Sequence, residues 1–221
     1  MTIVRGMPPG RTGRVWLHHR LEVAERGAGL LENKLRILAA EEQRFALLVA
    51  RDEREWTSAV AEADRWLSRA RVIGGQRALR LAATHSPAAV EVQWETTMGV
   101  QYPAHASTRL PDPPLDTATP DNTALVLAQQ AYQRALVVGA DYAAAARALR
   151  AVRAEVNATR RRLRALQKRW IPRLIGASYR LADALEEQER EAGVRMRWSA
   201  ARLAGRQGGA TRQPSDPRSP P

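Results

Sequence analysis

Small and apolar residues recur along the first part of the chain at alternating steps of four and three. The repeat is interrupted only at Glu42 and Asp52. Its members are Leu17, Leu21, Ala24, Ala28, Leu31, Leu35, Leu38, Phe45, Val49, Trp56, Ala59, Ala63, Trp66, Ala70 and Ile73. A heptad repeat of this length is typical of a coiled coil that needs a partner helix along its whole length. Two adjacent glycines at 74–75 mark the place where the helix should stop or bend.

A second heptad repeat occupies the C-terminal part of the chain. It consists of Ala128, Tyr132, Ala135, Gly139, Tyr142, Ala146, Leu149, Val152, Val156, Thr159, Leu163, Leu166, Trp170, Leu174, Ala177, Leu181 and Leu185. Two successive steps of four meet at Trp170, beside Pro172, whose ring clashes with the preceding turn of a helix. The pattern predicts a bend or a register slip there, with Pro172 as the bend residue. Heptad position favours Trp66 and Trp170 as seam fillers over partner anchors.

The connector between the repeats, residues 82–120, is rich in Pro, Thr, Ser and Asp. Within it Val90, Val92 and Trp94 alternate with polar residues, and Val100 and Tyr102 follow a glycine. This alternation predicts a short β-hairpin with one apolar face. The Gly, Arg, Pro and Ser composition at the end of the chain predicts a disordered tail.

Together these patterns predict an all-α fold, a long antiparallel two-helix coiled coil with a short β-hairpin in an irregular connector. The expected segments are a flexible N-terminus (1–13), a first helix (14–80), the connector (81–121), a second helix (122–205) and a disordered tail (206–221). Two helices joined by one connector must run antiparallel if they pack within the chain. At 1.5 Å per residue, a first helix of roughly 65 residues would be on the order of 100 Å long.

The composition excludes several classes of protein. The 221-residue chain contains no cysteine, which excludes disulfides, thiolate nucleophiles and thiolate metal sites. It shows neither the apolar core of a signal peptide nor an apolar run of about 18 residues, so we expect a membrane link only through partners. No phosphate-binding loop of the Walker type occurs, and His18, His19, His85 and His105 form no helical metal-binding pair. We therefore expect no catalytic residue, no cofactor and no metal, and interpret the histidines as solvent-facing or locally bonded.

The charge is unevenly distributed along the chain. The formal net charge is +12, and Lys34 and Lys168 are the only lysines. Residues 159–173 carry seven basic side chains and no acid, whereas residues 81–121 hold five acids and one arginine. The basic run is either a contact for an acidic protein partner or a solvated face. An alternative function is that of a free basic coiled coil that binds nucleic acid through its phosphates.

Two stretches of sequence resemble one known family. Residues 20–38, RLEVAERGAGLLENKLRIL, resemble the first helix of the D subunit of V-type ATPases, with its Arg-Leu, Ala, Arg-Gly, Leu-Leu, Lys and Leu. The family's second-helix pattern is matched by Glu155, TRRRL at 159–163, IPRL at 171–174 and LEEQERE at 185–191. The chain differs where it has KLRI at 34–37 in place of Lys-Arg-Asp-Glu, and Arg164 in place of Asn.

The resemblance implies a non-catalytic central rotor shaft that mechanically couples ATP hydrolysis or synthesis to ion translocation. The partners it implies are the catalytic and regulatory subunits of the hexamer, the small F subunit of the central stalk, and the cup-shaped subunit above the membrane ring. It implies a cytoplasmic location, peripheral to the membrane as part of the complex. Gly27 is the candidate for close packing against another backbone. The candidate hexamer contacts are Arg11, Arg14, Arg20, Arg26, Arg160, Arg161, Arg162, Arg164, Lys168 and Arg169.

Overall fold

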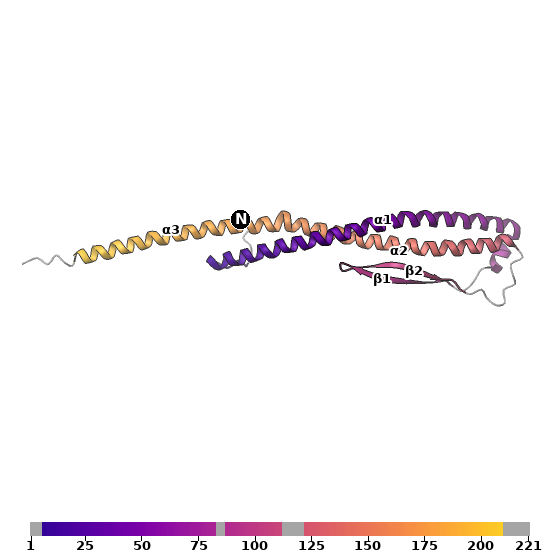
Figure 1. Cartoon of the computed structure of the whole chain (residues 1–221), viewed down its shortest axis with the longest axis horizontal. Coiled ribbons are helices and arrows are strands. Elements are labelled where there is room, and N and C mark those ends of the chain that lie inside the picture. Colours follow the sequence, from indigo (N-terminus) through magenta and orange to yellow (C-terminus); the bar gives the residue numbers. More distant parts are fainter. Residues whose placement is uncertain (1–5, 83–86, 112–121, 210–221) are drawn as a thin grey trace, which may run out of the picture. The chain divides into compact units, whose positions relative to one another are not determined.

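The computed structural model describes residues 6–82, 87–111 and 122–209 of the chain (Figure 1). The elements in order are α1 (Gly10–Ala82), β1 (Ala89–Thr97), β2 (Val100–Arg109), α2 (Thr123–Ala165), a π-helical turn η1 (Leu166–Trp170) and α3 (Ile171–Gly209). The expected mostly helical fold with one antiparallel hairpin is confirmed. The chain divides into two compact units, one made of residues 29–163 and the other of residues 1–28 with 164–221.

In the unit of residues 29–163, α1 and α2 pack side by side in opposite directions. Near one end Lys34 pairs with Glu155, and at the other the Asn122 side chain donates a hydrogen bond to the carbonyl of Ala70. The packed face is the predicted heptad seam, because its members Leu38, Ala63, Val152 and Val156 have no exposed surface. The seam therefore forms an intramolecular antiparallel helix pair.

The hairpin lies along this helix pair and is held by its second strand (Figure 1). Its two-residue turn has positive φ at Met98 (51°) and Gly99 (79°), the backbone of a type I′ turn that matches the twist of paired strands. Tyr102 is 2% exposed, and its ring meets Phe45 of α1 edge-on with centroids 5.0 Å apart. The alternation of apolar residues predicted this hairpin correctly.

The two glycines after the first seam produce a sharp kink in α1. Gly75 has φ 64° and ψ −176°, which breaks the helix although helical residues continue to Ala82. Beyond the kink, Leu79 and Ala82 pack on the cluster of Ala70 and Leu125. The heptad repeat assigned Ile73 to the seam, and this was wrong. Ile73 is 69% exposed because the seam ends at Ala70, and Leu79 and Ala82 pack there from beyond the kink.

In the other unit the start of α1 packs on α3 through Leu17, Ala24, Leu174 and Ala177. The helix begins at Gly10, whereas the pattern predicted residue 14. Near this start Arg11 forms an exposed ion pair of 3.0 Å with Glu189 of α3. At the other end α3 extends to Gly209. Residues 206–209 of the predicted tail are thus helical, and residues 210–221 lie outside the described part.

The predicted register slip beside Pro172 takes the form of a π turn. Residues 166–170 form η1, and the N–H of Ile171 bonds to the carbonyl of Leu166, five residues earlier. A π turn takes one more residue than an α turn, which accommodates the second successive step of four in the heptad pattern. Trp170, the last residue of this turn, is 39% exposed, so the seam-filler interpretation was wrong for it. Trp66 packs against the Ala70 cluster as expected.

Gly139 and Gly27 differ in the space that surrounds them. A Cβ at Gly139 would lie 2.9 Å from Nε1 of Trp56, whose indole stacks on Tyr142 at 5.4 Å. We expect Gly139→Ala to lower the free energy of unfolding by about 1–2 kcal/mol, because the indole must move.

Around a Cβ at Gly27 no described atom lies within 4 Å, so Gly27→Ala should raise the free energy of unfolding by about 1 kcal/mol. Thermal unfolding followed by circular dichroism measures both, and equal shifts would contradict the expectation.

Candidate functional site

The basic segment, residues 159–173, runs from α2 through η1 into α3. Thr159 and Leu163 are buried and fix which face of α2 packs on α1. Arg160 and Arg161 lie off that face, whereas Arg162 lies beside it near Glu155; all three side chains are exposed. The basic segment therefore presents exposed guanidinium groups around this part of α2.

The ten candidate contact residues are all exposed, and four of them already have a partner in the chain. Arg11 pairs with Glu189, Arg26 with Glu22, and Arg162 lies 3.6 Å from Glu155. Arg20 lies over the ring of Trp16 at 5.0 Å. The other six make no ion pair with a described acidic residue: Arg14, Arg160, Arg161, Arg164, Lys168 and Arg169. These six have charges that remain available to a partner.

The candidates are shared between the two units. Arg160, Arg161 and Arg162 belong to the unit of residues 29–163. The other seven belong to the second unit: Arg11, Arg14, Arg20, Arg26, Arg164, Lys168 and Arg169. The sequence grouped these residues by their charge alone. It contained no signal for which of them form intramolecular pairs, since those pairs depend on residues far away in the chain.

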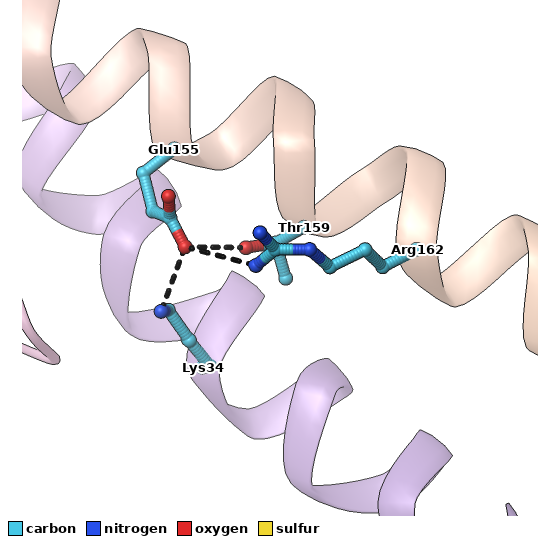
Figure 2. A network of polar contacts seen from close by, with 4 residues as sticks. All are labelled: Lys34, Glu155, Thr159 and Arg162. Carbon is cyan, nitrogen blue, oxygen red and sulfur yellow. Dashed lines mark hydrogen bonds and ion pairs between the residues drawn. The ribbon is translucent and has the colours of Figure 1, made fainter.

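One polar network crosses the helix pair beside the basic segment (Figure 2). Glu155 Oε1 accepts a hydrogen bond of 2.8 Å from Nζ of Lys34 and one of 3.4 Å from the hydroxyl of Thr159. Arg162 Nη1 is 3.6 Å from the same oxygen. The network joins α1 to α2 at the end of the basic segment, and it anchors Arg162 while its neighbours stay free.

The network makes stability depend on pH through one carboxyl group. The hydrogen bond from Lys34 lowers the pKa of Glu155, against the opposing effect of burial. A lowered pKa means that the stabilisation is present above the ordinary carboxyl range and is lost as pH falls through the lowered pKa. We expect Glu155→Gln to cost about 1–2 kcal/mol at pH 7 and to reduce the loss of stability on acidification. Denaturant titrations from pH 7 to 3 would measure this. Glu22→Gln, at an exposed pair, is the control, and an equal effect would contradict the prediction.

An apolar groove lies between the hairpin and α2, with a volume of about 630 Å³. The hairpin contributes Val90, Val92 and Trp94 of β1, which are 41–52% exposed. From α2 come Leu136 and several small residues around Gly139, and Arg147 is the one charged side chain in the lining. The β1 residues of the predicted apolar face thus form one wall of an open groove, whereas Val100 and Tyr102 of β2 are buried against the helix pair.

The two backbone candidates remain predictions. Around a Cβ at Gly27 no described atom lies within 4 Å, so the described residues supply no backbone that packs closely against it. Pro172 is the second residue of α3, directly after the π turn.

Two negative findings concern the described residues alone. None of their helices has the length and apolar composition needed to cross a bilayer, and no group of three potential metal ligands gathers among them.

Comparison with known proteins gives one consistent family. The model of the family described as the D subunit of ATP synthase matches residues 16–201. A V-type ATP synthase D subunit of Anaeromyxobacter sp. (strain Fw109-5) is 30% identical over 210 residues, which cover 93% of this chain and 98% of the relative. That of Anaeromyxobacter dehalogenans (strain 2CP-C) is 30% identical over 204 residues, with 87% and 94% covered. The match extends from α1 through the hairpin and α2 into α3, and the chain therefore belongs to the family of ATP synthase D subunits.

Proposed function

We propose that this chain is the central rotor shaft of a V-type ATPase or ATP synthase. The observation that carries the proposal is the match to the family of D subunits over residues 16–201, in a chain whose helices pair antiparallel in each unit. An ATP synthase subunit is one component of a multi-subunit complex. The part proposed here is mechanical, and ATP hydrolysis or synthesis takes place in other subunits.

The proposed mechanism is differential binding. An asymmetric shaft inside a ring of three catalytic interfaces favours a different conformation at each of them. Rotation then changes which interface is favoured, so that nucleotide affinity and shaft angle are thermodynamically coupled. The shaft in turn drives ion translocation through the cup-shaped subunit on the membrane ring. This mechanism needs no cofactor and no metal on the shaft.

The contacts with stationary subunits must form and break as the shaft turns. Exposed charged side chains suit such contacts, because water solvates them before the contact forms and after it breaks. Each such contact is also weak by itself. We therefore assign contact with the catalytic and regulatory subunits of the hexamer to the basic segment and to Arg11, Arg14, Arg20 and Arg26. Arg160 and Arg161 are the most direct candidates, since both are exposed and form no ion pair within the described residues.

A partner that rotates with the shaft has the opposite requirement, because its contact must persist. An apolar groove suits a lasting contact, since burial of apolar surface is not weakened by changes in charged surroundings. We assign the groove between β1 and α2 to the small F subunit. Leu136, which is 42% exposed in its lining, is the residue on which this assignment is tested.

Pro172 is proposed to maintain an eccentric shape that rotation requires. Pro172→Ala restores a backbone N–H to the first turn of α3, and we expect a gain in stability of about 1–3 kcal/mol together with reduced coupling. Hydrolysis-driven rotation of the reconstituted complex measures coupling. Unchanged rotation in the variant would contradict the role, whatever the change in stability.

The test of the proposed function is affinity capture from solubilised native membranes through a tag at the C-terminal end. Recovery of the catalytic and regulatory subunits with the small F subunit, identified by mass spectrometry, is the expected result. Leu136→Asp should lose the F subunit and keep the hexamer. Recovery of nucleic acid alone, released by salt, would contradict the rotor function and favour a basic nucleic-acid-binding coiled coil.

A further inference from the structure

The apolar groove between β1 and α2 is open to solvent although nearly all of its lining is apolar. Val92 and Trp94 of the hairpin and Leu136 of α2 line it and are 41%, 52% and 42% exposed. A cluster of large apolar side chains that stays exposed on a folded chain marks a contact site for a partner. The charge in the lining then indicates what that partner carries.

Arg147 of α2 is the one charged side chain in this lining. It is exposed and forms no ion pair with an acidic residue of the described ranges. The reason is local, because side chains three and four residues apart on a helix are neighbours. Residues 143, 144, 150 and 151 are Ala, Ala, Arg and Ala. The helical neighbours of Arg147 therefore offer it no carboxylate.

The hairpin offers no carboxylate to Arg147 either. Glu91 and Glu95 of β1 alternate with Val90, Val92 and Trp94, and successive side chains of a strand point to opposite faces. The apolar set lines the groove and the two acids do not. Within the part of the chain that the structure describes, the guanidinium of Arg147 is left without a counter-ion.

The position of Arg147 also places it far from both ends of the connector. Arg147 adjoins Ala148, which belongs with Val100 to the buried cluster at the turn end of the hairpin (Figure 1). From Val100, β2 runs nine residues to Arg109, about 30 Å. In the other direction α2 begins at Thr123, 24 residues before Arg147, or about 36 Å by helix rise.

These separations exclude the acids of the connector as partners of Arg147. Asp116 is seven residues from Thr123, which span about 24 Å when fully extended. That is too short to reach Arg147, even with the lengths of both side chains added. Asp112 and Asp121 are each closer to one end of the connector and have less reach. A carboxylate for Arg147 must therefore come with the occupant of the groove.

We infer that the occupant of the apolar groove presents a carboxylate among apolar side chains, and that Arg147 binds this carboxylate. The inference rests on the proposed function, which assigns the groove to the small F subunit. An apolar occupant without an acid would displace water from the guanidinium, and desolvation of an unpaired charge is unfavourable. Burial of apolar surface supplies the affinity, and Arg147 selects against segments that are purely apolar or basic.

The test is calorimetric titration of the full chain with purified F subunit. Arg147→Glu should weaken binding on the order of 10- to 50-fold, because two like charges then meet. Arg147→Met, which keeps an apolar side chain of similar length, should weaken it by roughly three- to tenfold. Arg150→Glu is the matched control and should stay within about twofold. It makes the same charge change at an exposed position on α2 that does not line the groove.

Two further measurements identify the contact as an ion pair. Between about 50 and 300 mM salt, the affinity of the wild type should fall more than the affinity of Arg147→Met, since salt screens the pair. Acidic residues of the F subunit are also replaced by Lys one at a time. One of these variants should restore binding to Arg147→Glu, and this rescue would identify the carboxylate.

The outcomes separate this inference from the proposed function. If wild type binds the F subunit and Arg147→Glu weakens binding no more than Arg150→Glu does, the inference is overturned and the assignment of the groove stands. If wild type does not bind the F subunit, the assignment is wrong and the inference fails with it. Self-association of the chain alone that Leu136→Asp abolishes would also overturn it, since the occupant would then be a second copy.

Discussion

Phe45→Ala is expected to lower the free energy of unfolding by about 3–5 kcal/mol, the range for removing a buried aromatic side chain. Phe45 is 3% exposed and belongs to the cluster that joins Leu38 and Val152 of the helix pair to Tyr102 of the hairpin. Its loss leaves a void between the helix pair and the hairpin, because the ring packs against both. Denaturant titration followed by circular dichroism measures the change.

The control for this variant is two residues away on the same helix. Leu47 is 75% exposed, so Leu47→Ala should change stability by less than about 0.5 kcal/mol. Phe45→Ala should also release the hairpin selectively, which hydrogen exchange of β2 amides would detect at low denaturant. A loss below about 1 kcal/mol, or equal effects of the two variants, would mean that the Phe45 cluster is not the core of this unit.

Under the proposed rotor function, replacing Arg160, Arg161 and Arg162 together with Gln is expected to weaken binding to the catalytic hexamer on the order of 10- to 100-fold. The estimate treats each guanidinium as a charge-assisted contact at the edge of an interface. Because the three side chains are exposed, thermal stability should change little, apart from the contact between Arg162 and Glu155 at 3.6 Å. Titration of the hexamer with the labelled shaft measures the affinity.

A triple variant of Arg54, Arg65 and Arg71 matches this change in charge on α1, where all three side chains are exposed. It should leave the affinity within about threefold if position on the shaft, and not net charge, determines binding. The affinity of the wild type should also fall more steeply with salt than the affinity of the triple variant at residues 160–162. Equal losses for both triple variants would mean that binding follows overall charge.

The sequence predicted the elements well because the heptad seam and the strand alternation are local patterns. It placed the buried Val152 and Val156 in the seam, and the hairpin face that carries Tyr102 is packed as expected. Its error at Ile73 has a local cause. The heptad repeat in the sequence continues to Ile73, whereas the helix bends at Gly75. The apolar pattern contains no information on where the partner helix stops.

The polar contacts were less predictable because their partners are distant in sequence. Glu42 and Asp52 stood out only as interruptions of the seam. In the structure Glu42 accepts a hydrogen bond of 2.9 Å from Arg153 of α2, whereas the buried Asp52 pairs at 2.8 Å with the adjacent Arg51. The signal that would have found such sites is an acid at a seam position, which requires a cation or a polar cavity opposite. The identity of that partner depends on register, which the sequence alone does not specify.

The kink at Gly75 has a consequence for how this gene tolerates mutation. Its φ of 64° with ψ of −176° lies in a region that is essentially restricted to glycine and costs other residues of order 1–3 kcal/mol. No described atom lies within 4 Å of a Cβ at this position, so space is not what excludes a side chain. The obstacle is chirality, since a D-residue would have the mirror-image backbone of an ordinary extended L-residue there. Ribosomes incorporate only L-residues and glycine. Every missense change at this codon therefore introduces backbone strain, whichever side chain it brings.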